Sequence, residues 1–185
     1  MSLTQIKVGG FGGQGVILAG SILGKAAAIH DDLYATMSRS YGPEARGGAC
    51  SAQILISDEP ITYPYVTRPD ILITLSSEAC DRYLADLAEN GSLLYESELV
   101  DPRNSPSSAK LCGIPCTRIA EELGSRVVLN IVMLGYFAQR CPVISKGAIQ
   151  EAIRSTVPPK TVDINFLAFE RGYTFSAKNE PVTAS

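Results

Sequence analysis

The sequence predicts an α/β fold, a three-layer Rossmann-like sandwich with a mostly parallel sheet. Two observations carry this prediction. Short apolar segments rich in β-branched residues alternate along the chain with helical segments, which is typical of parallel sheets with right-handed crossovers. The first expected strand also runs into a cluster of glycines and then an apolar helix, as in nucleotide-binding sheets. The 185 residues fit one domain, which we expect over residues 1–177, with a mobile tail at 178–185.

The first elements follow from hydrophobic periodicity. Residues 3–8 alternate in hydropathy and predict a strand, and the glycines that follow predict a turn. Apolar residues then recur at helical spacing over 16–26. Segments 33–36 and 49–57 have the composition and alternation of further strands.

The middle of the chain contains the most strongly apolar strand. Residues 70–75 are continuously apolar and β-branched after Asp70, which is typical of a strand buried on both faces near the centre of a parallel sheet. Residues 76–90 predict a helix that ends at a left-handed Asn90–Gly91 cap. Another strand follows at 92–96, and 99–116 predicts a loop that holds one short strand.

The last third of the sequence predicts helices. A short one is expected at 117–123 and a longer apolar one at 126–140, which Pro142 stops. Two amphipathic stretches, 146–156 and 162–172, complete the set.

Composition narrows the classes of function. Charged residues make up 19% of the chain, the net charge is −3 and the pI is about 5.2, so the basic surface of a nucleic-acid-binding protein is not expected. No apolar run reaches the roughly 18 residues that cross a bilayer, and the N-terminus lacks the pattern of a secretory signal. We therefore expect a cytoplasmic protein without nucleic-acid or membrane partners.

The glycine turn matches the spacing G-x-G-x-x-G at Gly10, Gly12 and Gly15. These glycines permit a tight turn, a close approach of backbone N–H groups to an anion, and close packing of the helix on the strand. A dinucleotide site also needs an acidic residue at the end of the second strand, but Asp31 and Asp32 precede that strand. The turn therefore leaves three interpretations open: a dinucleotide site, a site for another phosphate-bearing ligand, and a purely structural turn or subunit contact.

A second unusual segment, Ser38–Gly48, packs charged residues between two expected strands. Arg39 and Arg46 could grip a carboxylate or phosphate bidentately, and Glu44 could orient one of them. The alternative interpretation is a rigid, ion-paired loop. The candidate binding residues of the two segments, for a phosphate or coenzyme or for a partner subunit, are Gly10, Gly12, Gly13, Gln14, Gly15, Arg39, Tyr41, Glu44 and Arg46.

The two segments together resemble a paired signature of the gamma subunits of 2-oxoacid:ferredoxin oxidoreductases. The signature consists of the turn Gly10–Gly15 and the longer motif Ser40–Gly48 at this distance from it. The likeness continues through Arg68-Pro-Asp70, the turn at Gly91, Pro115 and the pattern Asn130-x-x-x-Leu134-Gly135. It weakens after Pro159.

This resemblance implies a non-autonomous subunit of an enzyme that oxidatively decarboxylates a 2-oxoacid to an acyl-CoA, which we expect to be 2-oxoglutarate giving succinyl-CoA. The complex would use thiamine diphosphate, Mg, [4Fe–4S] clusters and coenzyme A, and would pass electrons to ferredoxin. The partners would be alpha, beta and ferredoxin-like delta subunits. This chain would bind none of these cofactors alone and would supply no catalytic residue.

Two alternatives remain, a stand-alone nucleotide- or coenzyme-binding protein and a purely structural scaffold subunit. The residue types and their spacing offer little support for a catalytic triad or a metal site. His30 is the only histidine and lies near an expected helix end, which disfavours a catalytic triad. Cys112 and Cys116 have no Cys-x-x-Cys companions, so neither a zinc site nor an iron–sulfur site is expected, and the five cysteines predict core residues or free thiols.

Overall fold

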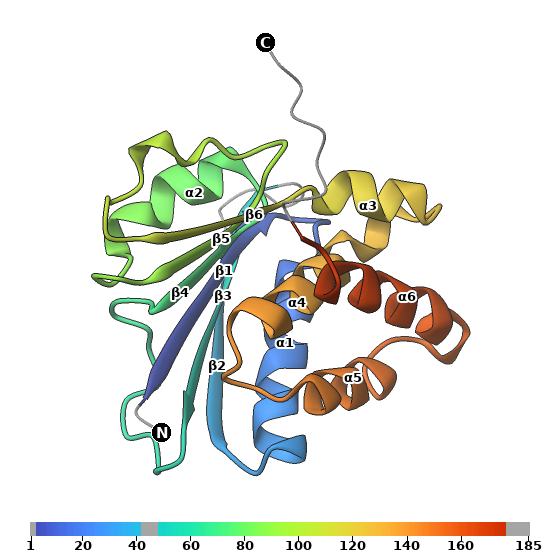
Figure 1. Cartoon of the computed structure of the whole chain (residues 1–185). Coiled ribbons are helices and arrows are strands. Elements are labelled where there is room, and N and C mark those ends of the chain that lie inside the picture. Colours follow the sequence, from blue (N-terminus) through green and yellow to red (C-terminus); the bar gives the residue numbers. More distant parts are fainter. Residues whose placement is uncertain (1–2, 42–47, 177–185) are drawn as a thin grey trace.

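The computed structural model describes residues 3–41 and 48–176, which form one α/β unit (Figure 1). The strands are β1 (Thr4–Phe11), β2 (Tyr34–Tyr41), β3 (Ala49–Ser57), β4 (Ile71–Thr74), β5 (Ser92–Glu96) and β6 (Lys110–Ile114). The main helices are α1 (Val16–Lys25), α2 (Ser77–Tyr83), α3 (Cys116–Glu122), α4 (Leu129–Arg140), α5 (Lys146–Arg154) and α6 (Val162–Tyr173). The tail expected at 178–185 lies outside the described residues.

The six strands form one sheet in the order β2-β3-β1-β4-β5-β6. Neighbours β1, β4, β5 and β6 are parallel, whereas β3 runs antiparallel to both β1 and β2. The prediction of a mostly parallel α/β sheet is therefore confirmed. Hydrophobic alternation fixes which face a residue occupies but not the direction of its strand, so the reversed β3 could not be predicted.

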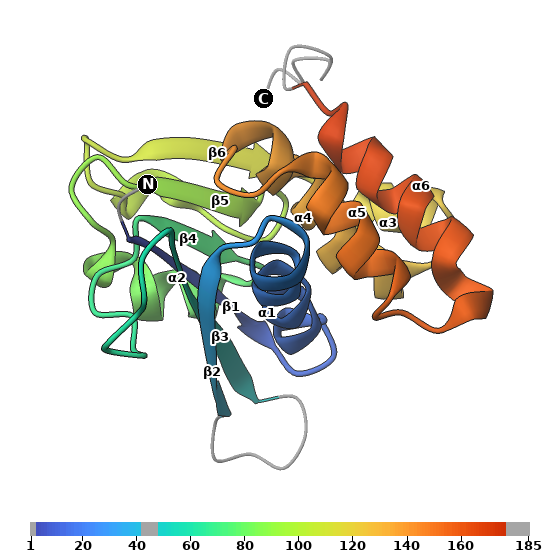
Figure 2. The ribbon, with the colours of Figure 1, turned by 90° about the horizontal axis from the view of Figure 1, so that it is seen from below.

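The second strand is longer than the sequence predicts. Expected to end at Thr36, β2 continues to Tyr41, where it pairs with Cys50 of β3. The sequence predicts a turn for residues 38–41, because their composition is rich in serine and charge. In the structure they are the last residues of β2 and pair antiparallel with the first residues of β3, and we call this paired end the hairpin arm. Figure 2 shows the paired ends of β2 and β3 extending beyond the other strands.

The two faces of the sheet are covered unequally. Helices α1, α4, α5 and α6 lie on one face and enclose the larger core, whereas α2 lies on the other (Figure 1). The smaller core under α2 contains Leu72, Cys80, Leu84, Leu87, Leu93 and Val100. Helices on both faces make three layers, as predicted.

The helix expected at 76–90 is shorter in the structure. After Tyr83 the chain makes one 3₁₀ turn, and the N–H of Ala88 then donates to the carbonyl oxygen of Pro69 at 2.9 Å. This long-range bond and the burial of Leu87 hold the segment against the sheet, which ends the helix early. Asn90 has a left-handed backbone, with φ of 61°, but it lies in the turn before β5, so the prediction that it caps this helix is wrong.

Helices α4 and α6 touch through two glycines. A Cβ atom at Gly135 would overlap the carbonyl oxygen of Phe169, and one at Gly172 would overlap the carbonyl oxygen of Val132. The backbones therefore approach more closely than any side chain allows. This contact anchors α6 on α4, the helix with the longest run of buried residues.

Candidate functional site

The two segments singled out in the sequence meet at the carboxyl end of β1. The N–H of Gly12 donates to the carbonyl oxygen of Gly48 at 2.9 Å, and Phe11 at the end of β1 pairs with Ala49 at the start of β3. The glycine turn and the hairpin arm thus lie side by side. Open α/β sheets place their binding crevices at this edge.

Three glycines of the turn are required by its geometry. Gly13 and Gly15 have φ of 100° and 74°, where side chains are disfavoured. A Cβ atom at Gly10 would lie 2.7 Å from Oε1 of Gln14, and one at Gly15 would lie 2.6 Å from Cγ of Asn130. The Asn130 amide also donates to the Gly15 carbonyl oxygen at 3.1 Å, which ties α4 to the start of α1.

The side chain of Gln14 braces the turn internally. Its Oε1 accepts from the N–H of Phe11 at 2.7 Å, and its Nε2 donates to the carbonyl oxygen of Leu75 at 2.8 Å. Gln14 therefore links the turn to the end of β4. Both polar atoms of its amide are bonded within the chain, and we propose that Gln14 holds the glycine turn in position.

We expect Gln14→Ala to lower the free energy of unfolding by about 2 kcal/mol, since it leaves a partly buried N–H and a carbonyl oxygen without partners. Urea unfolding followed by circular dichroism measures this change. The matched control is Gln150→Ala, which removes a bond to the half-exposed Glu170 carboxylate and should cost less than about 1 kcal/mol. Equal effects of the two substitutions would contradict the bracing role.

The turn retains donors for an external anion. The N–H groups of Phe11, Gly12 and Gln14 are bonded within the chain. Among the described residues, no group accepts from the N–H of Gly13, of Gly15 or of the first three residues of α1. Gly13 is exposed, and the positive end of the α1 dipole lies at the same place. These donors could bind a phosphate or carboxylate.

Arg39 and Tyr41 extend the site along the arm. Both side chains are exposed, and their register with Ala52 and Cys50 puts them on the face of the sheet that α1 covers. Within the described ranges, Arg39 has no ion-pair partner. Its exposed guanidinium could bind an anion at this edge of the sheet. The remaining two candidates from this segment of the sequence, Glu44 and Arg46, lie outside the described residues.

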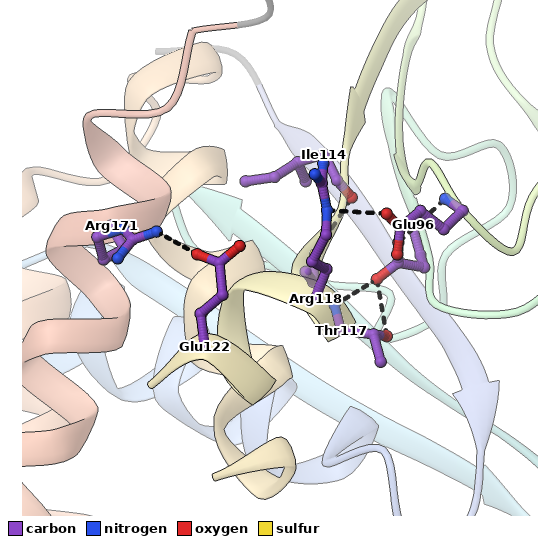
Figure 3. Close-up of polar contacts among 8 residues, drawn as sticks. Glu96, Ile114, Thr117, Arg118, Glu122 and Arg171 are labelled. Atoms are coloured by element: carbon purple, nitrogen blue, oxygen red, sulfur yellow. Dashed lines mark hydrogen bonds and ion pairs between the residues drawn. The ribbon is translucent and has the colours of Figure 1, made fainter. Parts of the chain in front are cut away.

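A buried carboxylate lies at the same edge, at the end of β5. Glu96 is fully buried, and its Oε2 accepts from the backbone N–H and the hydroxyl of Thr117 at 2.7 and 2.9 Å (Figure 3). Its Oε1 accepts from the N–H of Glu98 at 3.1 Å. Burial raises the pKa of Glu96, and these hydrogen bonds only partly oppose the increase. Sequence analysis missed this residue, although a glutamate that closes an apolar strand was a usable signal.

An apolar pocket opens beside the glycine turn. It has a volume of about 230 Å³, and Leu18, Val127, Asn130, Pro158 and Ile164 are among its lining residues. Ligand pockets usually measure about 300 to 1,000 Å³, so this one could hold a side chain or a small part of a larger ligand.

The cysteines and the histidine, all of them among the described residues, do not form a metal site. All five cysteines are free thiols, and burial raises the pKa of Cys141 to about 12 and that of Cys116 well above its usual value. The described part of the chain contains no group of three or more His, Cys, Asp or Glu residues placed to bind a metal ion. His30 is exposed at the end of the turn that follows α1. Within the same residues, no helix is both long and apolar enough to span a bilayer.

Comparison with known proteins gives consistent matches. The family model described as pyruvate ferredoxin/flavodoxin oxidoreductase matches residues 5–175. The chain is 47% identical over 171 residues to the 2-oxoglutarate synthase subunit KorC of Methanocaldococcus jannaschii, covering 91% of each protein. It also resembles the keto/oxoacid ferredoxin oxidoreductase gamma subunit of Geobacter sulfurreducens, with 40% identity, a TM-score of 0.81, and coverage of 92% of this chain and 96% of the other.

A more distant structure shows the same fold. The 2-oxoglutarate:ferredoxin oxidoreductase of Magnetococcus marinus, solved with 2-oxoglutarate, coenzyme A and succinyl-CoA bound, matches with a TM-score of 0.85 at 23% identity. The match covers 93% of this chain but 30% of the longer one.

Proposed function

The chain belongs to the pyruvate ferredoxin/flavodoxin oxidoreductase family, and we propose that it is the gamma subunit of a 2-oxoglutarate:ferredoxin oxidoreductase. The complex would decarboxylate 2-oxoglutarate, transfer the succinyl group to coenzyme A and pass the electrons to ferredoxin. The observation that carries this assignment is the match to a 2-oxoglutarate synthase subunit over 91% of both chains. A complex of this kind would work in the cytoplasm.

The reacting cofactors belong to other subunits in this proposal. An iron–sulfur cluster needs several thiolates close together, whereas no three potential metal ligands gather among the described residues, and the thiols are mostly buried, with raised pKa values. The described residues do not fit such a cluster. We assign the [4Fe–4S] clusters, thiamine diphosphate and its Mg to the alpha, beta and ferredoxin-like delta subunits.

The glycine turn and the arm would contribute to binding of coenzyme A. The N–H groups of Gly13 and Gly15 and the first turn of α1 provide donors for a phosphate, and Arg39 provides a charge on the same face of the sheet. Arg46, the candidate outside the described residues, would add a second guanidinium. The contribution of these groups is to bind and orient the thiol substrate.

We expect Arg39→Ala to raise the KM for coenzyme A about tenfold in the assembled complex, with a smaller change in kcat. A charge-assisted hydrogen bond to phosphate contributes about 1.5 to 3 kcal/mol, and about 1.4 kcal/mol corresponds to tenfold in affinity. Steady-state assays with saturating 2-oxoglutarate measure the effect. The charge-matched control is Arg103→Ala, because Arg103 is exposed and pairs locally with Asp101.

The internal bonding of the turn favours a second role, a contact with a neighbouring subunit. Gln14 and the Gly12 N–H are engaged within the chain, as expected of a rigid contact surface. In that case Arg39→Ala would reduce recovery of the complex and leave the KM for coenzyme A unchanged. Unchanged assembly together with an unchanged KM would contradict both roles.

A further inference from the structure

A second concave surface lies at the end of the sheet opposite the glycine turn. It is a pocket of about 530 Å³ between the start of β1 and the loop that joins β3 to β4. In Figure 1 this loop lies at the lower end of the sheet, below α2, far from the carboxyl end of β1. The lining residues that matter here are Gln5, Ser57, Asp58, Glu59, Tyr63 and Tyr65.

The loop is held on the sheet by two glutamine side chains. Oε1 of Gln5 accepts from the N–H of Thr67 at 2.8 Å, and Oε1 of Gln53 accepts from the N–H of Val66 at 3.1 Å. Pro60 and Pro64 restrict the backbone between β3 and these bonds. The pocket is therefore preformed.

Two tyrosines form an aromatic wall of the pocket. The rings of Tyr63 and Tyr65 meet edge to face, with their centroids 5.5 Å apart and an angle of 67° between planes. The two residues remain 60% and 56% exposed, so a ligand can reach their rings. Accessible ring faces attract cations, and a guanidinium binds them best because it stacks on them as well.

The charge that lines the pocket is negative, as binding of a cation requires. Glu59 is exposed and lines the pocket next to the aromatic wall, and its N–H donates to Oγ of the buried Ser57 at 3.0 Å. Among the described residues that line the pocket, none is a lysine, arginine or histidine. A carboxylate beside tyrosine rings is complementary to an organic cation that is both planar and charged.

We propose that this pocket binds an arginine side chain of a neighbouring subunit in the oxidoreductase complex, an inference that rests on the proposed function. Tyr63 and Tyr65 are more than half exposed, so a small cation bound there would stay largely hydrated and weakly held. An arginine on a partner surface is desolvated by the contacts around it, which strengthens both the stacking and the ion pair. The pocket is thus a docking site distinct from the glycine turn.

Assembly tests this inference directly. The tagged chain is co-expressed with the thiamine-binding and iron–sulfur subunits, and partner recovery is measured at increasing salt. Tyr63→Ala with Tyr65→Ala should reduce recovery at least tenfold, whereas phenylalanine at both positions should preserve it. Glu59→Gln should shift release to lower salt. The controls are Tyr34→Ala, an exposed tyrosine that does not line the pocket, and Glu89→Gln, an exposed carboxylate outside it.

The experiment distinguishes a failure of the pocket inference from a failure of the proposed function. If the wild-type chain recovers its partners and the tyrosine-to-alanine variant does so equally well, the pocket inference is wrong and the proposed function stands. If the wild-type chain recovers no partner, the proposed function fails, and the pocket is judged by NMR titration with N-acetyl-arginine amide at high concentration, which registers the weak binding expected of a small cation. Shifts at Tyr63 and Tyr65 that Glu59→Gln weakens would support the pocket, and their absence would overturn it. Binding of spermidine a hundredfold tighter would replace the partner arginine with a free polyamine.

Discussion

Alanine at Gly135 or at Gly172 is expected to lower the free energy of unfolding by about 3 kcal/mol or more. At each position the added methyl group would overlap a backbone carbonyl oxygen of the facing helix, that of Phe169 or of Val132. Backbone atoms cannot move aside as a side chain does, so α4 and α6 would have to separate. That separation would disturb the core around the buried ring of Phe137.

The measurement is urea unfolding followed by circular dichroism for each variant. Gly147→Ala is the matched control, because Gly147 lies within helix α5 and an added Cβ atom there meets nothing within 4 Å. It should leave the protein as stable as the wild type or stabilise it by up to about 1 kcal/mol. Similar unfolding midpoints for Gly135→Ala and Gly147→Ala would contradict the close approach of α4 and α6.

Glu96→Ala is expected to cost about 3 kcal/mol, the second large effect. The substitution removes both carboxylate oxygens, and it leaves the N–H of Thr117 at the start of α3 and the N–H of Glu98 in the turn after β5 without partners (Figure 3). A buried donor without an acceptor costs about 1 to 3 kcal/mol. Urea unfolding near pH 5 gives the value, and Glu89→Ala, at an exposed position, should change it little. An effect as small as that of Glu89→Ala would refute the role of Glu96.

The same residue gives stability a pH dependence with a defined sign. The pKa of Glu96 is raised above its usual value of 4.5, because burial disfavours the charged carboxylate. The contribution of protonated Glu96 to the free energy of unfolding is therefore fully present below about pH 4.5. It is lost as the pH rises through the raised pKa. Glu96→Gln, which carries no titratable proton, should flatten the pH dependence of unfolding in that window. An identical pH profile for the wild type and Glu96→Gln would contradict this assignment.

Much of the fold follows from local patterns in the sequence. The run at 70–75 predicted a buried central strand and the structure has one there, and the glycine turn precedes helix α1 as expected. The antiparallel hairpin arm did not follow. Its last residues, including Arg39 and Ser40, are polar and exposed on both faces, so their composition resembles that of a turn although they pair with β3.

The candidate site was predictable in its parts but not in its connections. The turn and the arm could each be located, yet the bond from Gly12 to Gly48 and the contact between Gly15 and Asn130 join segments distant in the sequence. Periodicity carries no information on such pairs. The pocket beside Tyr63 and Tyr65 was missed for the same reason, because its aromatic wall and the start of β1 meet only in the folded chain.

The central claim, that this chain is a subunit of a 2-oxoglutarate:ferredoxin oxidoreductase, is tested most directly by purification of the tagged chain from its source organism. We predict that thiamine-binding and iron–sulfur subunits elute with it, and that the eluate reduces a viologen dye only when both 2-oxoglutarate and coenzyme A are present. A chain that elutes alone, and that NAD, FAD or ATP stabilises against thermal unfolding, would contradict the account and favour a stand-alone nucleotide-binding protein.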